Sequence, residues 1–313
     1  MLQMLSSIPS PADGNIGFVH IYGLLIAIGV VVSTTFADRR WRRRGGDKDT
    51  IGDLAFILVI FGAIGARLYH VATDYEMYFP DNMGQIINVT KGGLSIWGAV
   101  LGGLLALIVV AKRRKLPTLM LADCLAPAIL IAQAIGRWGN YANQELFGKP
   151  LDAPWALEIL PQHRPPAYLE YSTFHPTFLY ESLWCLAMFF VITFLERRRH
   201  WKVGQATFAY VALYTLGRFA FENMRIDFAR KIGPLRFNAW VSVVLFIVGV
   251  VGFLYYGRNG KEWPVTPDGT PDGKPGPLLA SQTSSASDST TTSPTEDVNE
   301  YEATRVATEG LEQ

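Results

Sequence analysis

Apolar residues occur in seven long runs, separated by short polar or charged segments. A helix needs about twenty apolar residues to cross the hydrocarbon core of a bilayer. Seven stretches meet or approach that length, namely 16–36, 54–72, 94–111, 119–135, 178–195, 203–219 and 239–256. The pattern predicts an all-α polytopic membrane protein with about seven transmembrane helices. The first run follows a short uncharged leader, so we expect it to stay as a membrane helix rather than to be cleaved as a signal peptide.

Basic residues gather in alternate connections between these runs. They follow the first run (Arg39, Arg40, Arg42, Arg43, Arg44 and Lys48), the third (112–115) and the fifth (Arg197, Arg198, Arg199 and Lys202). Such connections face the cytosol under the positive-inside rule. We therefore expect the N-terminus outside and the C-terminus in the cytosol, and we interpret the basic runs as topology determinants rather than binding sites.

The remaining connections and the C-terminal segment differ in composition. Residues 140–175, rich in prolines and aromatic residues, are too long for a passive link, which predicts an ordered extracytosolic cap between spans 4 and 5. From about residue 258 the chain turns into Pro, Gly, Ser, Thr and acidic residues, which cannot form a core. We expect a transmembrane catalytic domain over 1–257 and a disordered cytosolic tail over 258–313.

Composition narrows the possible partners. The formal net charge is +1, which argues against a nucleic-acid partner. Cys124 and Cys185 both lie in apolar runs without a CxxC pattern, so we interpret both as packing residues. No metal-ligand cluster and no cofactor motif occurs. Small residues four apart, Gly98 with Gly102 and Gly62 with Ala66, predict close helix packing.

Ionisable side chains at membrane depth are costly and usually mark a site. The predicted topology brings polar groups from five helices to the outer half of the bundle: His20, Tyr22, Arg67, His70, Gln133, Arg137, Tyr180, Glu181, Arg218 and Glu222. The structural alternative is a set of ion pairs, since Arg218 and Glu222, and Glu222 and Arg225, share a helical face. Convergence of several arginines and carboxylates on one level favours a site. Asp123 is the exception, near the cytosolic end, where it is expected to cap its helix or pair with a neighbour.

Arginine suits phosphate because its planar fork donates two parallel hydrogen bonds and stays charged. Arg137 and Arg218, at the outer ends of two spans, could hold one phosphate, and in a bilayer the obvious phosphate is a phospholipid headgroup. Around Arg137 the stretch 136–148, GRWGNYANQELFG, is dense in glycine, amide and charge.

This stretch resembles the prolipoprotein diacylglyceryl transferases of bacterial inner membranes. It matches their signature G-R-x-G-N-[FY]-x-N-x-E-x-x-G at every fixed position. Further family elements follow in the right order and extend the resemblance over 10–257: Tyr22-Gly23-Leu24, Gly65-Ala66-Arg67, Gly92-Gly93-Leu94-Ser95, Asp123, His175-Pro176-Thr177, Tyr180-Glu181, Gly217-Arg218-Phe219, Glu222 and Arg225.

The resemblance implies a multi-pass enzyme of the bacterial plasma membrane. It would transfer the diacylglyceryl group of phosphatidylglycerol to the lipobox cysteine thiol in a prolipoprotein signal peptide, with release of glycerol phosphate. The family's essential or phosphate-binding residues fall on Tyr22, Arg137, Asn140, Gly148 and Arg218. Further functional positions are Glu145, Glu181 and Glu222, and we add Arg67 and His175 as predicted substrate contacts.

One position departs from the family. Some members carry a histidine, proposed as a base, where this chain has Trp97. Indole only donates hydrogen bonds, so Trp97 cannot accept a proton. Candidate bases are Glu145, Glu181, Glu222, His20 and His175.

The expected chemistry uses the thiol of the substrate as nucleophile. Arg137 and Arg218 would stabilise the departing phosphate, Asn140 would position the headgroup, and Tyr22 would hydrogen-bond phosphate or thiol. Nearby arginines would also raise the thiolate fraction. Two alternatives stay open, a secondary transporter and a non-catalytic protein that binds anionic lipid.

Overall fold

The computed structural model describes residues 7–11, 15–16, 19–79, 82–88, 92–229 and 231–263. The predicted tail lies outside the described residues from 264 onward, and so does the side chain of His20.

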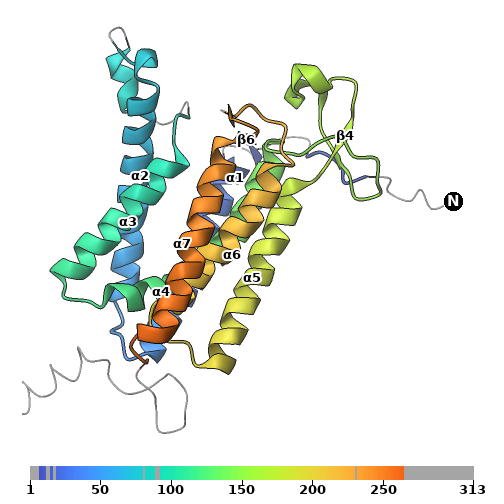
Figure 1. The fold of residues 1–313 in the computed structure, drawn as a ribbon. Coiled ribbons are helices and arrows are strands. Elements are labelled where there is room, and N and C mark those ends of the chain that lie inside the picture. Colours follow the sequence, from blue (N-terminus) through green and yellow to red (C-terminus); the bar gives the residue numbers. More distant parts are fainter. Residues whose placement is uncertain are drawn as a thin grey trace, which may run out of the picture.

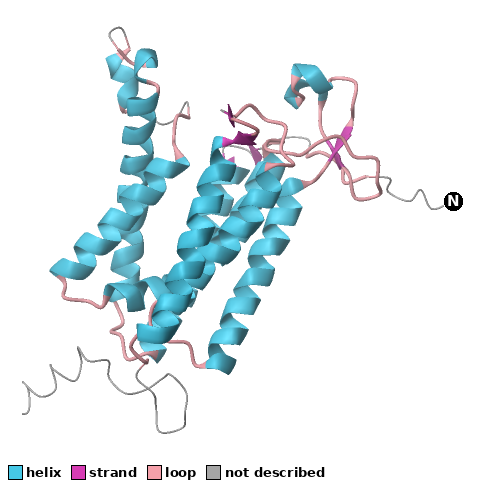
Figure 2. Ribbon diagram, viewed as in Figure 1, coloured by secondary structure: helices cyan, strands magenta, loops and turns pink. Residues whose placement is uncertain are grey.

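The described part of the chain is dominated by seven α-helices (Figures 1 and 2). They are α1 (Ile21–Arg43), α2 (Thr50–Thr73), α3 (Ile96–Arg113), α4 (Thr118–Ala142), α5 (Thr177–Arg199), α6 (Gln205–Glu222) and α7 (Phe237–Asn259). Six of them are long and apolar enough to cross a membrane. Helix α6 is less apolar because it carries Gln205, Arg218 and Glu222. The all-α polytopic membrane fold is confirmed.

Several helix ends differ from the apolar runs. Helix α1 begins at Ile21 rather than 16, because residues before it pair in a short hairpin, β1 (Asn15–Ile16) with β2 (Val19–His20). It then continues to Arg43, since arginine favours helix and nothing breaks the chain before Gly45, which has a φ of 78°. Helix α4 extends beyond the predicted end at 135 and takes the first seven signature residues into its last turns.

Helices α1 and α4–α7 pack into one bundle, while α2 and α3 form a pair that stands apart from it (Figure 1). The α2–α3 contact is backbone against backbone. A Cβ added at Gly98 would collide with the carbonyl oxygen of Gly65, and one at Gly102 with that of Phe61. The close packing predicted for the small residues is confirmed there.

Residues 143–176 form the ordered subdomain expected between α4 and α5. Strand β3 (Leu157–Glu158) pairs antiparallel with β4 (Thr173–Phe174), beside the short helices η3 (Pro161–His163) and η4 (Pro166–Tyr168). Phe147, Ile159 and Phe174 fill its core. Residues 7–11 contact both this cap and α4. Ile8 forms a bridge with Leu157 of the cap, and Tyr141 of α4 donates a hydrogen bond to the Pro9 carbonyl over 2.8 Å. We call this end of the bundle the cap end.

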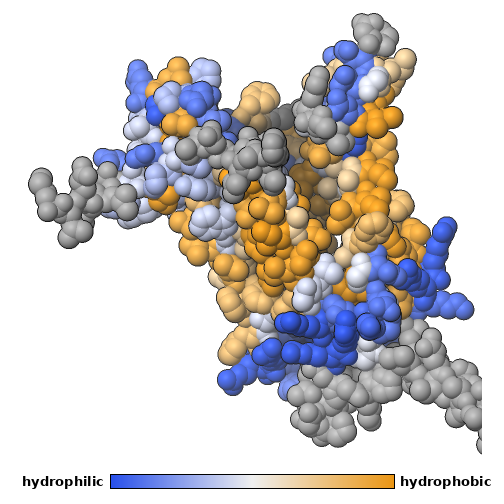
Figure 3. All heavy atoms as spheres, turned by 180° about the vertical axis from the view of Figure 1, so that it is seen from behind, coloured by the Kyte–Doolittle hydropathy of each residue, from blue (hydrophilic) through white to orange (hydrophobic). Residues whose placement is uncertain are grey.

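The connections at the cap end also include the short helices η1 (Tyr75–Met77) and η2 (Met83–Ile86) before α3. After α6 comes a hairpin of β5 (Lys231–Ile232) and β6 (Leu235–Arg236). An apolar band separates the cap end from the opposite, basic end (Figure 3).

At the basic end, a few charged residues are buried and have polar partners. Asp123 is fully buried and accepts hydrogen bonds from the backbone N–H groups of Gly204 (2.6 Å) and Thr207 (2.8 Å). It therefore caps α6 rather than its own helix. Glu196 pairs with Arg40 at 2.8 Å and with Arg44 at 2.5 Å, which joins α5 to the end of α1. Cys124 and Cys185 are buried and unbridged, as expected for packing residues.

Candidate active site

Three helices bring Arg137, Glu181 and Arg218 together at the cap end. Arg137 Nη2 on α4 lies 2.7 Å from Glu181 Oε2 on α5, and Arg218 Nη1 on α6 lies 3.8 Å from the same oxygen. The Glu181 side chain is only 5% exposed, whereas the two arginines are 16% and 19% exposed. A buried carboxylate therefore holds two partly accessible guanidinium groups side by side.

Glu222, the last residue of α6, is the second centre of the site. Its fully buried carboxylate lies 2.7 Å from Arg218, 3.1 Å from Arg236 and 3.7 Å from Arg225. Both helical-face pairs expected from the spacing, Arg218–Glu222 and Glu222–Arg225, are present. The ion pairs that the spacing suggested as a structural alternative are thus part of the same network as the convergent arginines and carboxylates.

Arg236 and Asp227 belong to this network, although the sequence did not single them out. The Arg236 guanidinium donates to the backbone carbonyls of Glu222 (3.1 Å), Arg225 (3.2 Å) and Asp227 (2.8 Å). Arg225 Nε and Arg236 Nη2 lie 2.7 and 2.9 Å from the Asp227 carboxylate. Burial raises the pKa of Asp227, but the hydrogen bonds and charges of the two arginines outweigh it and hold that pKa below its ordinary value. The signal that could have revealed Arg236 is its place directly before an apolar run.

The signature segment adds a chain of polar contacts that starts at Arg137. Arg137 Nη1 lies 3.5 Å from Asn140 Oδ1, and Asn140 Nδ2 donates to Glu145 Oε1 over 2.8 Å. Asn143 reaches the same oxygen at 3.4 Å. Glu145 is exposed and is held by amides, without an arginine partner among the described residues.

Tyr22, at the start of α1, lies beside these polar residues of the signature segment. Its ring lies against Gly139, where a Cβ would overlap the ring, so the glycine allows α1 to approach α4. The Tyr22 side chain lies near Asn140 and within electrostatic range of Arg137 and Glu145.

Gly148 and His175 meet where the cap joins the bundle. Gly148 N–H donates to the His175 carbonyl over 3.0 Å, and Gly148 pairs with Arg225 in an isolated bridge. A Cβ on Gly148 would lie 2.8 Å from His175 Cβ, so a larger residue would push the cap away. The His175 ring contacts the Tyr180 hydroxyl at 3.3 Å, and its pKa is lowered by burial and by the charge of Lys149.

Arg67 has a different environment from the other arginines. Its side chain is buried, and each of its five N–H donors meets a backbone carbonyl, at 2.5–3.0 Å, from Gln85, Ile86, Asn88, Gly92 and Gly93. A guanidinium used in this way organises the loop between α2 and α3. Its substrate contact stays a prediction.

Trp97, in the first turn of α3, is linked to Glu222 through Asn238. Its indole nitrogen donates to Asn238 Oδ1 over 3.3 Å, and Asn238 Nδ2 lies 3.4 Å from Glu222 Oε1.

Comparison with known proteins gives one consistent family. A sequence model described as prolipoprotein diacylglyceryl transferase matches residues 14–255. The chain belongs to this family. It is 45% identical over 272 residues to the phosphatidylglycerol--prolipoprotein diacylglyceryl transferase of Streptomyces griseus, covering 84% of this chain and 82% of the relative.

Relatives with the same name occur in other genera. The one from Cutibacterium acnes is 44% identical over 78% of this chain and 85% of its own length. The one from Mycobacteroides abscessus is 40% identical over 87% and 84%. The diacylglyceryl transferase family thus extends over the whole helical part that carries the network around Glu181 and Glu222.

Proposed function

We propose that this protein transfers the diacylglyceryl group of phosphatidylglycerol to the lipobox cysteine thiol of prolipoproteins, as a multi-pass enzyme of the bacterial plasma membrane. Membership in the transferase family supports the reaction. The cap end would face outward and the tail would lie in the cytosol, as the basic connections indicate.

The observation that carries this proposal is the position of Arg137 and Arg218 around one oxygen of Glu181. The ion-paired network as a whole holds four arginines (137, 218, 225 and 236) against three carboxylates (181, 222 and 227). Two guanidinium groups fixed side by side can each donate to a phosphate, and buried carboxylates keep them in place before the lipid arrives.

The reaction forms one bond and breaks one bond. The substrate sulfur attacks the glycerol carbon that bears the phosphate ester, so a C–S thioether bond forms as the C–O bond breaks. The electron pair of the C–O bond stays on the phosphate oxygen, and glycerol phosphate departs. Arg137 and Arg218 stabilise the charge that develops there, and Asn140 and Tyr22 hold the headgroup.

The proton of the thiol goes to Glu145 and from there to water. Glu181 and Glu222 are each occupied by arginine partners, so we assign them to holding those arginines in place. Among the described residues the Glu145 carboxylate has amide partners alone, and it is exposed, so it can accept a proton and pass it on. Gly148 and Arg67 have positioning roles. Gly148 positions the cap junction, and Arg67 positions the loop before α3.

The test is thioether formation by the purified full chain with phosphatidylglycerol and a lipobox peptide. Wild type should release glycerol phosphate in step with lipidated peptide. Arg137→Lys and Arg218→Lys keep the charge but lose the fork, so turnover should fall by about a hundredfold or more. Arg164→Lys is the matched control, because the described hydrogen bonds of the Arg164 side chain go to cap carbonyls, at 2.8 and 3.2 Å.

Two outcomes would count against the proposal. Near-normal turnover in both lysine variants of the site would overturn the paired-arginine phosphate site. Lipid binding by a folded wild-type chain without any product would favour the non-catalytic lipid-binding alternative instead.

A further inference from the structure

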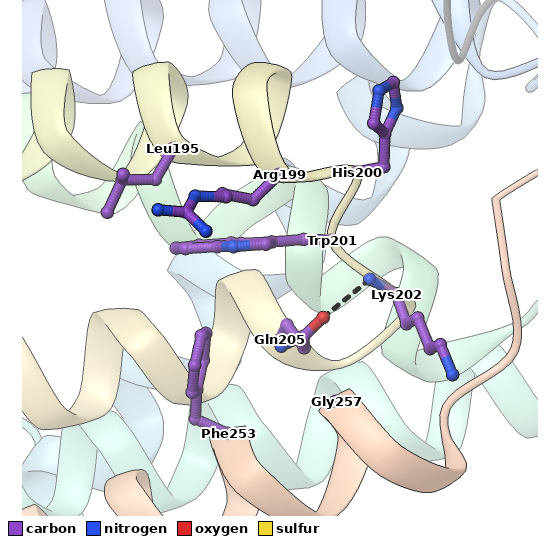
Figure 4. Close-up of a pocket in the computed structure, with 8 residues that line it drawn as sticks. All are labelled: Leu195, Arg199, His200, Trp201, Lys202, Gln205, Phe253 and Gly257. Atoms are coloured by element: carbon purple, nitrogen blue, oxygen red, sulfur yellow. Dashed lines mark hydrogen bonds between the residues drawn. The ribbon is translucent and has the colours of Figure 1, made fainter.

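A cavity of about 530 Å³ opens at the basic end, far along the helices from the network around Glu222 (Figure 4). It lies where α5 ends, α6 begins and α7 ends, and its lining includes Leu195, Arg199, Trp201, Lys202, Gln205 and Phe253.

One wall of the cavity is apolar. Trp201 is 8% exposed and packs edge-on against Phe253, with ring centroids 5.1 Å apart. Leu195 continues this wall along α5 (Figure 4). Gln205 fixes the rim, because its side-chain oxygen accepts the Lys202 backbone N–H over 2.8 Å.

The other wall is cationic. Arg199 and Trp201 both line the cavity, and Figure 4 labels them next to each other. Arg199 is exposed, and it forms no hydrogen bond or ion pair with any residue in the described part of the chain. His200 and Lys202 flank it, and Lys202 spends one of its three N–H donors on the Arg258 carbonyl at 3.3 Å.

Within the part of the chain that the structure describes, no carboxylate pairs with these charges. The lining contains no Asp or Glu, and Glu196, the nearest acidic residue along α5, is already paired with Arg40 and Arg44. At the cap end, by contrast, each clustered arginine has a carboxylate partner. The basic-end cavity thus offers unpaired positive charge beside an apolar wall, at the level where the membrane-spanning helices end.

We propose that this cavity binds the phosphate headgroup of an anionic phospholipid from the leaflet on the basic side. Arg199 and Lys202 would hold the phosphate, and an acyl chain would run along Leu195 and Phe253. Basic pockets between membrane helices recognise anionic headgroups in this way. Free phosphate would gain nothing from the apolar wall, which is why we assign a lipid. The basic residues after α5 would then form a binding site in addition to setting topology.

The test counts lipids bound to the full chain by native mass spectrometry, with dioleoyl phosphatidic acid as the probe. Every variant carries Arg137→Gln, so that lipid bound at the cap end does not mask the result. Adding Arg199→Gln together with Lys202→Gln should lower the affinity of the basic-end cavity for this lipid by roughly ten- to thirtyfold, since each basic residue contributes about fivefold.

Arg198→Gln is the matched control. It removes the same charge one residue away, but Arg198 lies over Phe194 at 5.2 Å and does not line the cavity. The lipid affinity of this variant should stay within about twofold of the parent, since the variant loses only a screened long-range attraction to the phosphate. Dioleoyl phosphatidylcholine should bind more weakly than phosphatidic acid, and millimolar inorganic phosphate should not displace the lipid.

The inference fails if the double variant binds like its parent, if Arg198→Gln loses as much, if phosphatidylcholine binds equally well, or if free phosphate competes. Turnover is a separate readout. With Arg137 restored, Arg199→Gln/Lys202→Gln should transfer diacylglyceryl groups at the wild-type rate, so failure of this inference leaves the transferase assignment unaffected.

Discussion

The indole nitrogen of Trp97 donates a hydrogen bond to the side-chain oxygen of Asn238, over 3.3 Å. Within the described residues it is the one side-chain hydrogen bond between the α2–α3 pair and helices α4–α7. Because the Asn238 oxygen is occupied, its amide nitrogen faces Glu222. A residue that cannot act as a base thus links a separate helix pair to the ion network.

Replacing Trp97 by Phe should remove this link while keeping an aromatic ring. We expect turnover to fall about two- to tenfold, with a stability loss of only about 1 kcal/mol. Trp240→Phe is the control, since its indole donates to Ile232 at the hairpin and not to the network. Peptide lipidation by both variants is the measurement, and equal rates for Trp97→Phe and wild type would contradict the link.

Arg236 holds the turn after α6 against the buried Glu222. Arg236→Gln should leave two carboxylates short of a partner and destabilise the protein by about 3 kcal/mol. The buried thiols Cys124 and Cys185 make unfolding measurable with a thiol-reactive dye in a thermal ramp. Lys231→Gln is the control, because Lys231 is exposed and pairs with Arg236 only through the β5–β6 backbone. Equal melting curves for the two variants would refute this role.

Asp227 should make stability depend on acid. Its pKa in the folded protein lies below the unfolded value, so the folded state favours the charged form. This contribution is complete above the unfolded pKa, about 3.9, and is lost as the pH falls through the folded pKa. Asp227→Asn should therefore lower the melting temperature at pH 7 and flatten its decline below about pH 4. An identical acid decline in the variant would show that other groups cause it.

The sequence predicted the helices and most residues of the candidate site, because both depend on local patterns. Apolar runs located seven helices, and the signature located Arg137, Asn140 and Glu145. The sequence did not reveal Arg236 and Asp227, because they lie in the irregular segment and short hairpin between α6 and α7, where no periodicity marks them. Asp123 was expected to cap its own helix or to pair with a neighbour, and its partners are Gly204 and Thr207, which only the tertiary fold brings close.

Arg67 is a residue that the sequence singled out but whose contacts it could not predict. An arginine near a helix end within a family element suggested substrate contact. Its five carbonyl partners come from a loop 18–26 residues further on, a geometry that no spacing rule supplies.

Gln144 occupies a non-fixed position of the signature, yet it ties three segments together. It is buried, accepts the Leu160 N–H at 2.9 Å and donates to the Pro11 carbonyl at 3.1 Å. Its φ of 51° is strained for a side chain other than glycine or asparagine. Gln144→Ala should destabilise by about 2 kcal/mol through the unpaired Leu160 N–H.

Gln144→Gly separates the two effects. It loses the same hydrogen bonds but relieves the backbone, so it should be more stable than Gln144→Ala by about 1 kcal/mol. The thiol-dye melting curves of the two variants give the comparison. A glycine variant no more stable than the alanine variant would mean that the positive φ carries no strain.

The folded unit should extend to Trp263, past the boundary at 257 that composition predicted. Helix α7 ends at Asn259, and the Lys261 carbonyl then accepts the Val203 N–H over 2.8 Å. Trp263 is buried, and the Arg44 guanidinium lies over its ring at 3.9 Å. Removing such a buried aromatic side chain typically costs about 3–5 kcal/mol.

A chain ending at 263 should therefore melt like the full-length protein, while a chain ending at 257 should melt well below it. Trp263→Ala in the full-length chain should reproduce most of that loss, which separates the indole contact from the last turn of α7. If the chain ending at 257 melts like the one ending at 263, the contacts of residues 258–263 do not contribute to stability and the composition boundary is the better one.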